Sequence, residues 1–168
     1  NAIFEPLWNY ENIEKVEIYL YETLDVDERA SFYDSIGALK DVGQNHLLQM
    51  LALVAMEDPG GMRVDNLHKA RLDVLSRLIP FGRRIEDYAF RAQYKGYTEN
   101  SNSAKDSNTE TFFEIKLGVN NRRWRGVPFV LRAGKALNES SSEIKVYFKE
   151  KPSFVCLSED ACSYNNVL

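Results

Sequence analysis

Residues 37–56 read GALKDVGQNHLLQMLALVAM and carry the strongest structural signal in the chain. Apolar residues recur in this stretch at the three- and four-residue spacing of a helix. Between residues 47 and 54 the stretch is apolar on nearly every side, which is typical of a helix that is buried on most sides. The turn sequence DPGG at residues 58–61 ends the pattern. The stretch therefore predicts one long, largely buried helix, which we expect to pack along a sheet.

Alternation of apolar and polar residues predicts strands on both sides of this helix. In residues 14–21, Val16, Ile18 and Leu20 fall on one face, and charged and aromatic residues fall on the other. Residues 109–119 alternate in the same way. Further strands are predicted at residues 88–94, 128–132 and 143–148, and a second helix at residues 64–78.

The order of these elements indicates the fold class. Strands outnumber helices, and the two are not regularly interleaved, which favours an α+β fold over a doubly wound one. We expect a large, mostly antiparallel sheet with helices packed on one face. A Rossmann coenzyme domain would need GxGxxG between a first strand and a helix, and the sequence has none. Residues 97–108, which are rich in Asn and Ser, predict a mobile loop.

Composition excludes several classes of function. The chain has 168 residues, 44% hydrophobic and 27% charged, which suits one domain with a single core. A net charge of -4 and an isoelectric point near 5.3 argue against nucleic-acid binding. Cys156 and Cys162 form no disulfide framework and no metal cluster, so we expect reduced thiols in a cytoplasmic protein without a metal. No stretch approaches the roughly 18 apolar residues of a membrane span.

Polar residues cluster where the long helix begins. Residues 40–49 read KDVGQNHLLQ, and side chains of these polar types are costly to bury without partners. The residues alone favour a structural role for His46, and a pocket lined by the cluster is the alternative. On an ideal α-helix Asp41 and His46 point about 140° apart, so they cannot pair on one face but could both reach a ligand across the helix start. The other histidine, His68, is expected at the surface.

Five segments of the chain resemble glucose-6-phosphate dehydrogenases. Residues 41–49, DVGQNHLLQ, are similar to the family's R-D-x-x-Q-N-H-L-L-Q, with Lys40 in place of the arginine. The segments occur in family order, span nearly the whole chain and are rich in Trp, Pro and Gly. The other four are NAIFEPLWN at 1–9, QYKGY at 93–97, SNTETF at 107–112 and RWRGVPFVLRAGK at 123–135.

The resemblance implies an activity and a set of site residues. The family oxidises C1 of glucose 6-phosphate to 6-phosphogluconolactone in the pentose phosphate pathway, with NADP or in some members NAD. By residue match, His46 is the general base that takes the proton of the C1 hydroxyl, a role that suits histidine at neutral pH. Glu22 and Asp41 match positions that hydrogen-bond sugar hydroxyls, and Lys135 matches a lysine that contacts the substrate. Without the resemblance, Glu22 would be a surface carboxylate and Lys135 a solvated loop lysine.

Two departures from the family pattern affect the expected site. Gly43 stands where a bulky apolar residue is usual, which leaves space three residues before His46 and lowers helix propensity. Ser140 falls about where a second substrate-contacting cation is expected, so that contact is missing or comes from elsewhere.

The resemblance covers the carboxyl-terminal domain, so residues 1–168 are expected to be a part of that domain, truncated at both ends. The family's coenzyme domain and its phosphate-binding H-Y-L-G-K segment would lie upstream, and NADP would be held mostly outside this chain. The sheet would form a homodimer or homotetramer contact in the full-length enzyme. The alternative is a non-catalytic dimerisation or sugar-phosphate-binding module derived from the family.

Overall fold

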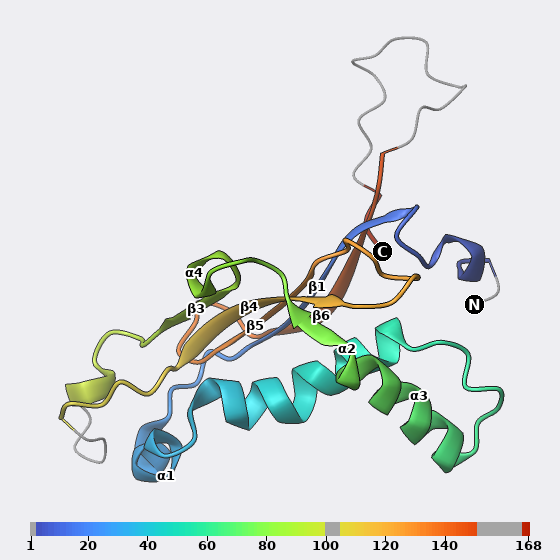
Figure 1. Ribbon diagram of the computed structural model, residues 1–168. Coiled ribbons are helices and arrows are strands. Elements are labelled where there is room, and N and C mark those ends of the chain that lie inside the picture. Colours follow the sequence, from blue (N-terminus) through green and yellow to red (C-terminus); the bar gives the residue numbers. More distant parts are fainter. Residues whose placement is uncertain (1–2, 100–104, 151–165) are drawn as a thin grey trace.

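The computed structural model describes residues 3–99, 105–150 and 166–168, and it has an α+β fold (Figure 1). A single sheet has the strand order β2-β4-β5-β1-β6, with β3 also paired to β4. Among the described strands, only β1 and β5 pair in parallel, and every other pair is antiparallel. The predicted fold class is therefore confirmed. The strands are β1 (Ile13–Tyr21), β2 (Leu78–Pro80), β3 (Ala89–Ala92), β4 (Phe112–Val119), β5 (Phe129–Gly134) and β6 (Ser141–Phe148).

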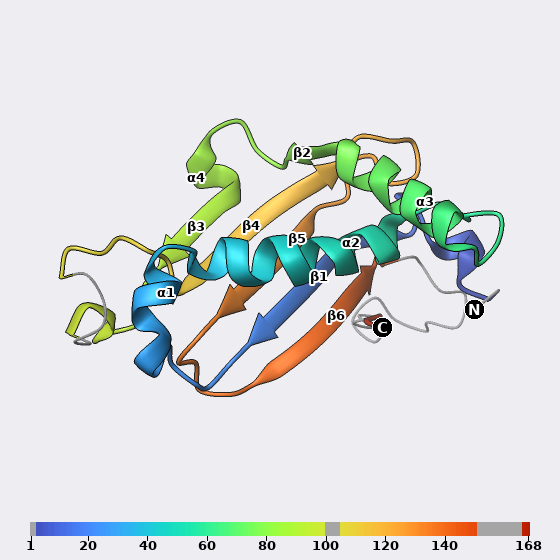
Figure 2. The ribbon, with the colours of Figure 1, turned by 90° about the horizontal axis from the view of Figure 1, so that it is seen from below.

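The predicted long helix crosses one face of the sheet (Figure 2). It consists of a π-helical segment, η3 (Leu39–Leu47), that continues directly into α2 (Leu48–Ala55). The helix α3 (Val64–Ser76) lies beside its end. The described residues also form short helices: η1 (Glu5–Leu7), η2 (Asp27–Arg29), α1 (Ala30–Asp34), α4 (Ile85–Tyr88) and η4 (Tyr97–Glu99).

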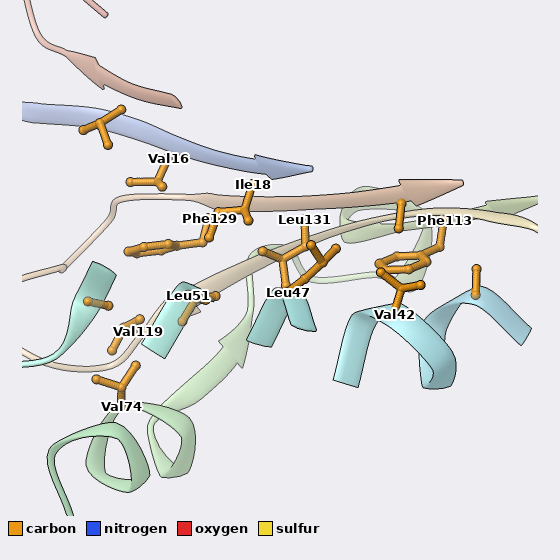
Figure 3. Close-up of a cluster of buried hydrophobic side chains, with 14 of the residues drawn as sticks. Val16, Ile18, Val42, Leu47, Leu51, Val74, Phe113, Val119, Phe129 and Leu131 are labelled. Carbon is orange, nitrogen blue, oxygen red and sulfur yellow. The ribbon is translucent and has the colours of Figure 1, made fainter. Parts of the chain in front are cut away.

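The core lies between this helix and the inner face of the sheet (Figure 3). Leu47 and Leu51 are fully buried opposite Phe129 and Leu131 of β5. Burial of each such side chain contributes about 1.5–3 kcal/mol. Leu53, by contrast, is 51% exposed. The helix is therefore less completely buried in this chain than its apolar sequence predicts.

Two tryptophans hold the carboxyl end of the helix. The indole nitrogen of Trp8 donates to the carbonyl of Val54, and that of Trp124 donates to the carbonyl of Ala55, each at 2.8 Å. The last carbonyls of a helix have no partner within it, so these two bonds satisfy groups that would otherwise be buried unpaired. The two rings also meet edge to face with centroids 6.4 Å apart.

The outer face of the sheet is more covered than simple alternation predicts. Glu17 and Tyr19 are only 9% and 8% exposed, although both point away from the core. Arg132 lies 2.6 Å from a carboxylate oxygen of Glu114 and 3.5 Å from one of Glu17. Burial raises the pKa of Glu17, but hydrogen bonds from Lys15 and Tyr147 outweigh it, and the net pKa is lowered. Charged and aromatic side chains therefore cover this face by packing on one another.

Several element boundaries differ from the sequence prediction. The second helix ends at Ser76, and residues 78–80 form the edge strand β2, which was missed because a three-residue strand with a proline has no alternation to detect. The predicted loop at 97–108 begins with η4, and its residues 100–104 lie outside the described part, as do both cysteines. No helix of the described residues is long and apolar enough to cross a membrane.

Gly43 leaves no open space, contrary to expectation. It is buried, and a β-carbon placed there would lie 2.9 Å from the Phe113 ring and 3.2 Å from a methyl of Leu39. Phe113 is itself only 3% exposed, so its ring cannot move aside easily. A large residue of β4 therefore fills the volume that the helix gives up at this position.

We expect Gly43→Met to lower the free energy of unfolding of this chain by about 1–3 kcal/mol, because overpacking outweighs the better helix propensity of methionine. Denaturant unfolding measures the change. In a Phe113→Ala background the same substitution should cost much less or stabilise the chain. A stabilising effect in the presence of Phe113 would show that the glycine and the ring are not complementary.

Candidate active site

Two of the predicted site residues meet at the end of the parallel strand pair. Tyr21 of β1 pairs with Gly134 of β5, and Glu22 and Lys135 directly follow them. Parallel strands end at the same edge of a sheet, which is where ligands bind in many sheets. The Lys135 ammonium forms an ion pair with the Glu22 carboxylate, with the side chains 14% and 34% exposed. The structure thus brings these two residues together.

The loops that carry this ion pair are tied to each other by main-chain hydrogen bonds. Leu137 donates to the carbonyl of Glu22, and Ala136 donates to that of Leu24, each at 3.0 Å. Ala136 has a φ of 55°, a left-handed backbone that is uncommon outside glycine. Ser140 accepts a 3.0 Å hydrogen bond from the Thr23 amide. Ser140 therefore closes the loop pair and places no cation there.

The other two predicted residues lie on the π-helical segment, and their relation differs from the α-helical expectation. The Leu48 amide donates to the carbonyl of Gly43, which is the i→i−5 bond of a π-helix. A wider turn brings residues five apart onto the same side. Asp41 and His46 are five apart and both belong to this segment, so the predicted separation of about 140° is wrong.

The polar residues of this helical turn do not line a closed pocket. Asp41 is half-buried, while Gln44, Asn45 and His46 are exposed. Asn45 donates to the main-chain carbonyl of Asp41 at 3.3 Å, which leaves the Asp41 carboxylate unused. Within the described residues His46 makes no hydrogen bond or ion pair. This side of the helix is therefore an open surface with available polar groups.

Tyr33 of α1 lies near both the Glu22–Lys135 ion pair and Asp41, and the sequence did not predict it as a site residue. It is 3% exposed, and the Lys135 ammonium lies 5.9 Å from its ring centre. Burial, and next the nearby Asp41 carboxylate, raise the pKa of the Tyr33 phenol. Its hydroxyl is the one buried side-chain polar atom without a partner among the described residues. Leaving such a group unpaired costs about 1–3 kcal/mol.

Hydrogen bonds to Asp34 hold α1, and hence Tyr33, in place. The Tyr97 hydroxyl donates to the Asp34 carboxylate at 2.9 Å, and Ser107 donates to the same oxygen. Thr109 donates to the Asp34 carbonyl at 2.6 Å. The Tyr33 and Tyr97 rings meet edge to face with centroids 6.5 Å apart. The Tyr33 ring is therefore fixed from two sides.

Glu110 holds the start of the helix that carries Asp41 and His46. Its carboxylate accepts a 3.0 Å hydrogen bond from the Leu39 amide, and its carbonyl accepts one from Ala38. A carboxylate suits the positive end of a helix. Gly37 has a φ of 74°, and a β-carbon there would lie 2.5 Å from the Glu110 carboxylate. Glu110 lies within the SNTETF segment, but only the folded chain shows what it contacts.

The described residues show no metal cluster, and their one Gly-Gly pair is not a phosphate-binding loop. No group of three His, Cys, Asp or Glu side chains in the described ranges could hold a metal ion. Gly60 and Gly61 lie in the exposed turn between α2 and α3, so they do not connect a strand to a helix as a phosphate-binding loop does.

We expect Glu110→Ala to lower the free energy of unfolding by about 1 kcal/mol, the usual effect of losing a helix-start acceptor. Glu110→Gln should retain most of the stability, because its amide oxygen can still accept from Leu39. The matched control is Glu139→Ala, at an exposed carboxylate. Thermal melting of the variants tests this, and equal melting temperatures for Glu110→Ala and the control would contradict it.

Comparison with known proteins supports one family. The chain is 41% identical, over its whole length, to the glucose-6-phosphate 1-dehydrogenase of Borreliella burgdorferi and covers 37% of it. It is 42% identical over 90% of its length to that of Bacillus subtilis, and covers 33% of it. The chain thus spans about a third of the length of the curated relatives it matches.

Solved structures of the same family are also similar to this chain. The crystal structure of glucose-6-phosphate 1-dehydrogenase from Mycobacterium avium matches with a TM-score of 0.84 and 40% identity, over 92% of this chain and 34% of that one. A glucose-6-phosphate dehydrogenase in complex with its substrate glucose-6-phosphate matches with a TM-score of 0.83 and 36% identity, over 91% and 33%. The family model "Glucose-6-phosphate dehydrogenase, C-terminal domain" matches residues 1–168. The chain therefore belongs to the glucose-6-phosphate dehydrogenase family and corresponds to its C-terminal domain.

Proposed function

We propose that this chain supplies the sugar-binding surface and the general base of an enzyme that oxidises glucose 6-phosphate to 6-phosphogluconolactone. The observation that carries the proposal is the meeting of Glu22 and Lys135 at the ends of β1 and β5. A carboxylate and an ammonium at one edge are complementary to a polyol that carries a phosphate. Asp41 and His46 present further polar groups from the neighbouring π-helical segment.

Substrate binding has to compete with the ion pair. In the unliganded chain, Lys135 and Glu22 satisfy each other. A sugar phosphate can take both, because its hydroxyls donate to carboxylates and its anionic oxygens accept from an ammonium. The Asp41 carboxylate has no side-chain hydrogen bond among the described residues, so it can accept from a second hydroxyl without losing a partner. These contacts would orient C1 toward His46.

His46 is the proposed base. Its exposed imidazole has no hydrogen-bond partner among the described residues, which leaves a ring nitrogen available to accept the C1 hydroxyl proton. The same proton acceptance leaves electron density on the C1 oxygen that drives loss of a hydride from C1. In the family, NADP accepts that hydride. The sequence has no GxGxxG loop for a dinucleotide, so we assign no part of hydride transfer to this chain.

We further propose that the outer face of the sheet contacts another copy of the chain in the whole enzyme. Tyr19 and Tyr21 stack there with ring centroids 4.9 Å apart, next to the Arg132, Glu17 and Glu114 network. Tyr and Arg are enriched at the centres of protein interfaces. A cytoplasmic location is proposed from relatives in Arabidopsis thaliana that carry that word in their names.

The isolated chain should not reduce NADP in the presence of glucose 6-phosphate, because its sequence lacks the GxGxxG loop of a coenzyme domain. Absorbance of the reduced coenzyme measures this directly. The same preparation should be folded by circular dichroism, which serves as the control. Steady turnover by the purified chain would contradict the proposed division of the enzyme.

In the whole enzyme, His46→Asn should lower kcat by about 10²–10⁴-fold with a much smaller change in KM, because asparagine can hydrogen-bond the C1 hydroxyl but cannot take its proton. Lys135→Ala should mainly raise KM, because it removes a contact made in both ground and transition states. His68→Asn, at an exposed histidine of α3, is the matched control. Steady-state kinetics and thermal melting on one preparation decide the matter: a stable His46→Asn enzyme with near-normal kcat excludes the base role.

A further inference from the structure

One buried group near the proposed site has no explanation in the folded chain alone. The Tyr33 hydroxyl is buried and lacks a partner among the described residues, whereas Tyr97 beside it donates to Asp34. Native proteins leave few buried polar atoms unpaired, and such exceptions often mark a site that is completed by something else. Purely structural packing at this position would be served as well by phenylalanine.

The surroundings of the hydroxyl are those of a sugar site. The Lys135–Glu22 ion pair lies beside the ring, with the ammonium 5.9 Å from the ring centre. After burial, the Asp41 and Glu110 carboxylates, and more weakly that of Glu22, raise the phenol's pKa further, so the hydroxyl stays protonated and can donate. Tyr33 is therefore close enough to Asp41 and to the Lys135–Glu22 ion pair to be affected by their charges.

The hydroxyl cannot swing to find another partner. Its ring is packed on Tyr97, and its helix is tied through Asp34 to Ser107 and Thr109. A partner must therefore come to it. A ligand that separates Lys135 from Glu22 would uncover this part of the site and bring hydroxyl groups to the phenol.

We propose that Tyr33 is a further substrate-contacting residue, whose hydroxyl hydrogen-bonds a sugar hydroxyl of the bound sugar phosphate once the Lys135–Glu22 pair opens. The proposal rests on the proposed function. It gives the unpaired group a role: the hydroxyl is unsatisfied in the empty site and satisfied only with substrate. Tyr33 then contributes to substrate affinity, while its unpaired hydroxyl lowers the stability of the empty protein.

The test is Tyr33→Phe in the whole enzyme, with glucose 6-phosphate as the probe. KM should rise about three- to tenfold, the equivalent of one hydrogen bond. The melting temperature without ligand should stay the same or rise, because an unpaired buried group is removed. The rise in melting temperature on adding glucose 6-phosphate should shrink. Tyr97→Phe is the matched control, and should show the opposite pattern, with lower stability and a smaller change in KM.

Deoxy analogues separate a direct contact from an indirect one. With 2-, 3- and 4-deoxyglucose 6-phosphates, the ratio of variant to wild-type KM should fall close to one for the analogue that lacks the bonded hydroxyl. An unchanged KM for glucose 6-phosphate, a clear loss of stability in Tyr33→Phe without ligand, or a constant ratio for all analogues would overturn the proposal. Failure of the proposed function is distinct, since the wild-type enzyme would then show neither turnover nor a melting shift with glucose 6-phosphate.

Discussion

The packing of the η3–α2 helix against the inner face of the sheet is the interaction on which the rest of the structure depends. Leu47 and Leu51 are buried against β5, and Phe113 of β4 fills the volume left at Gly43. Because protein interiors are close-packed, this fit allows one axial position of the helix. The position in turn sets where Asp41 and His46 stand relative to the strand ends.

Both ends of that helix are fixed by groups from distant parts of the chain. Glu110 accepts from Leu39 at its start, and Trp8 and Trp124 donate to its last carbonyls. All three lie in segments that resemble the family. These three residues place the helix, whereas Lys135, in the same segment as Trp124, is proposed to contact the substrate. Tyr33 is the position where stability and the proposed function conflict. Its unpaired hydroxyl lowers the stability of the unliganded chain next to the proposed site.

The sequence predicted what depends on local periodicity. Alternation located β1, β4, β5 and β6, and apolar spacing located the long helix and α3. The π-helical segment was out of reach, because apolar spacing does not distinguish i→i−4 from i→i−5 hydrogen bonds. Filling of the space at Gly43 depends on Phe113, seventy residues away. Tyr33 lies in a polar stretch with no periodic signal, and its importance depends on being buried next to Lys135. The site residues themselves were named through family resemblance, and spacing alone would not have selected Glu22 or Lys135.

The single parallel pair in an otherwise antiparallel sheet explains why these residues meet at all. Val16 to Tyr21 pair with Phe129 to Gly134, so Glu22 and Lys135 leave the sheet side by side. Had β5 run the other way, Lys135 would have left at the opposite edge, about 15–20 Å from Glu22 at 3.3 Å per residue. Parallel neighbours also require a crossover connection. Here the crossover contains the helix, which begins near the carboxyl ends of β1 and β5 and contacts both strands (Figure 2). The same topological requirement therefore delivers the ion pair and the helical turn with Asp41 and His46 to one edge of the sheet.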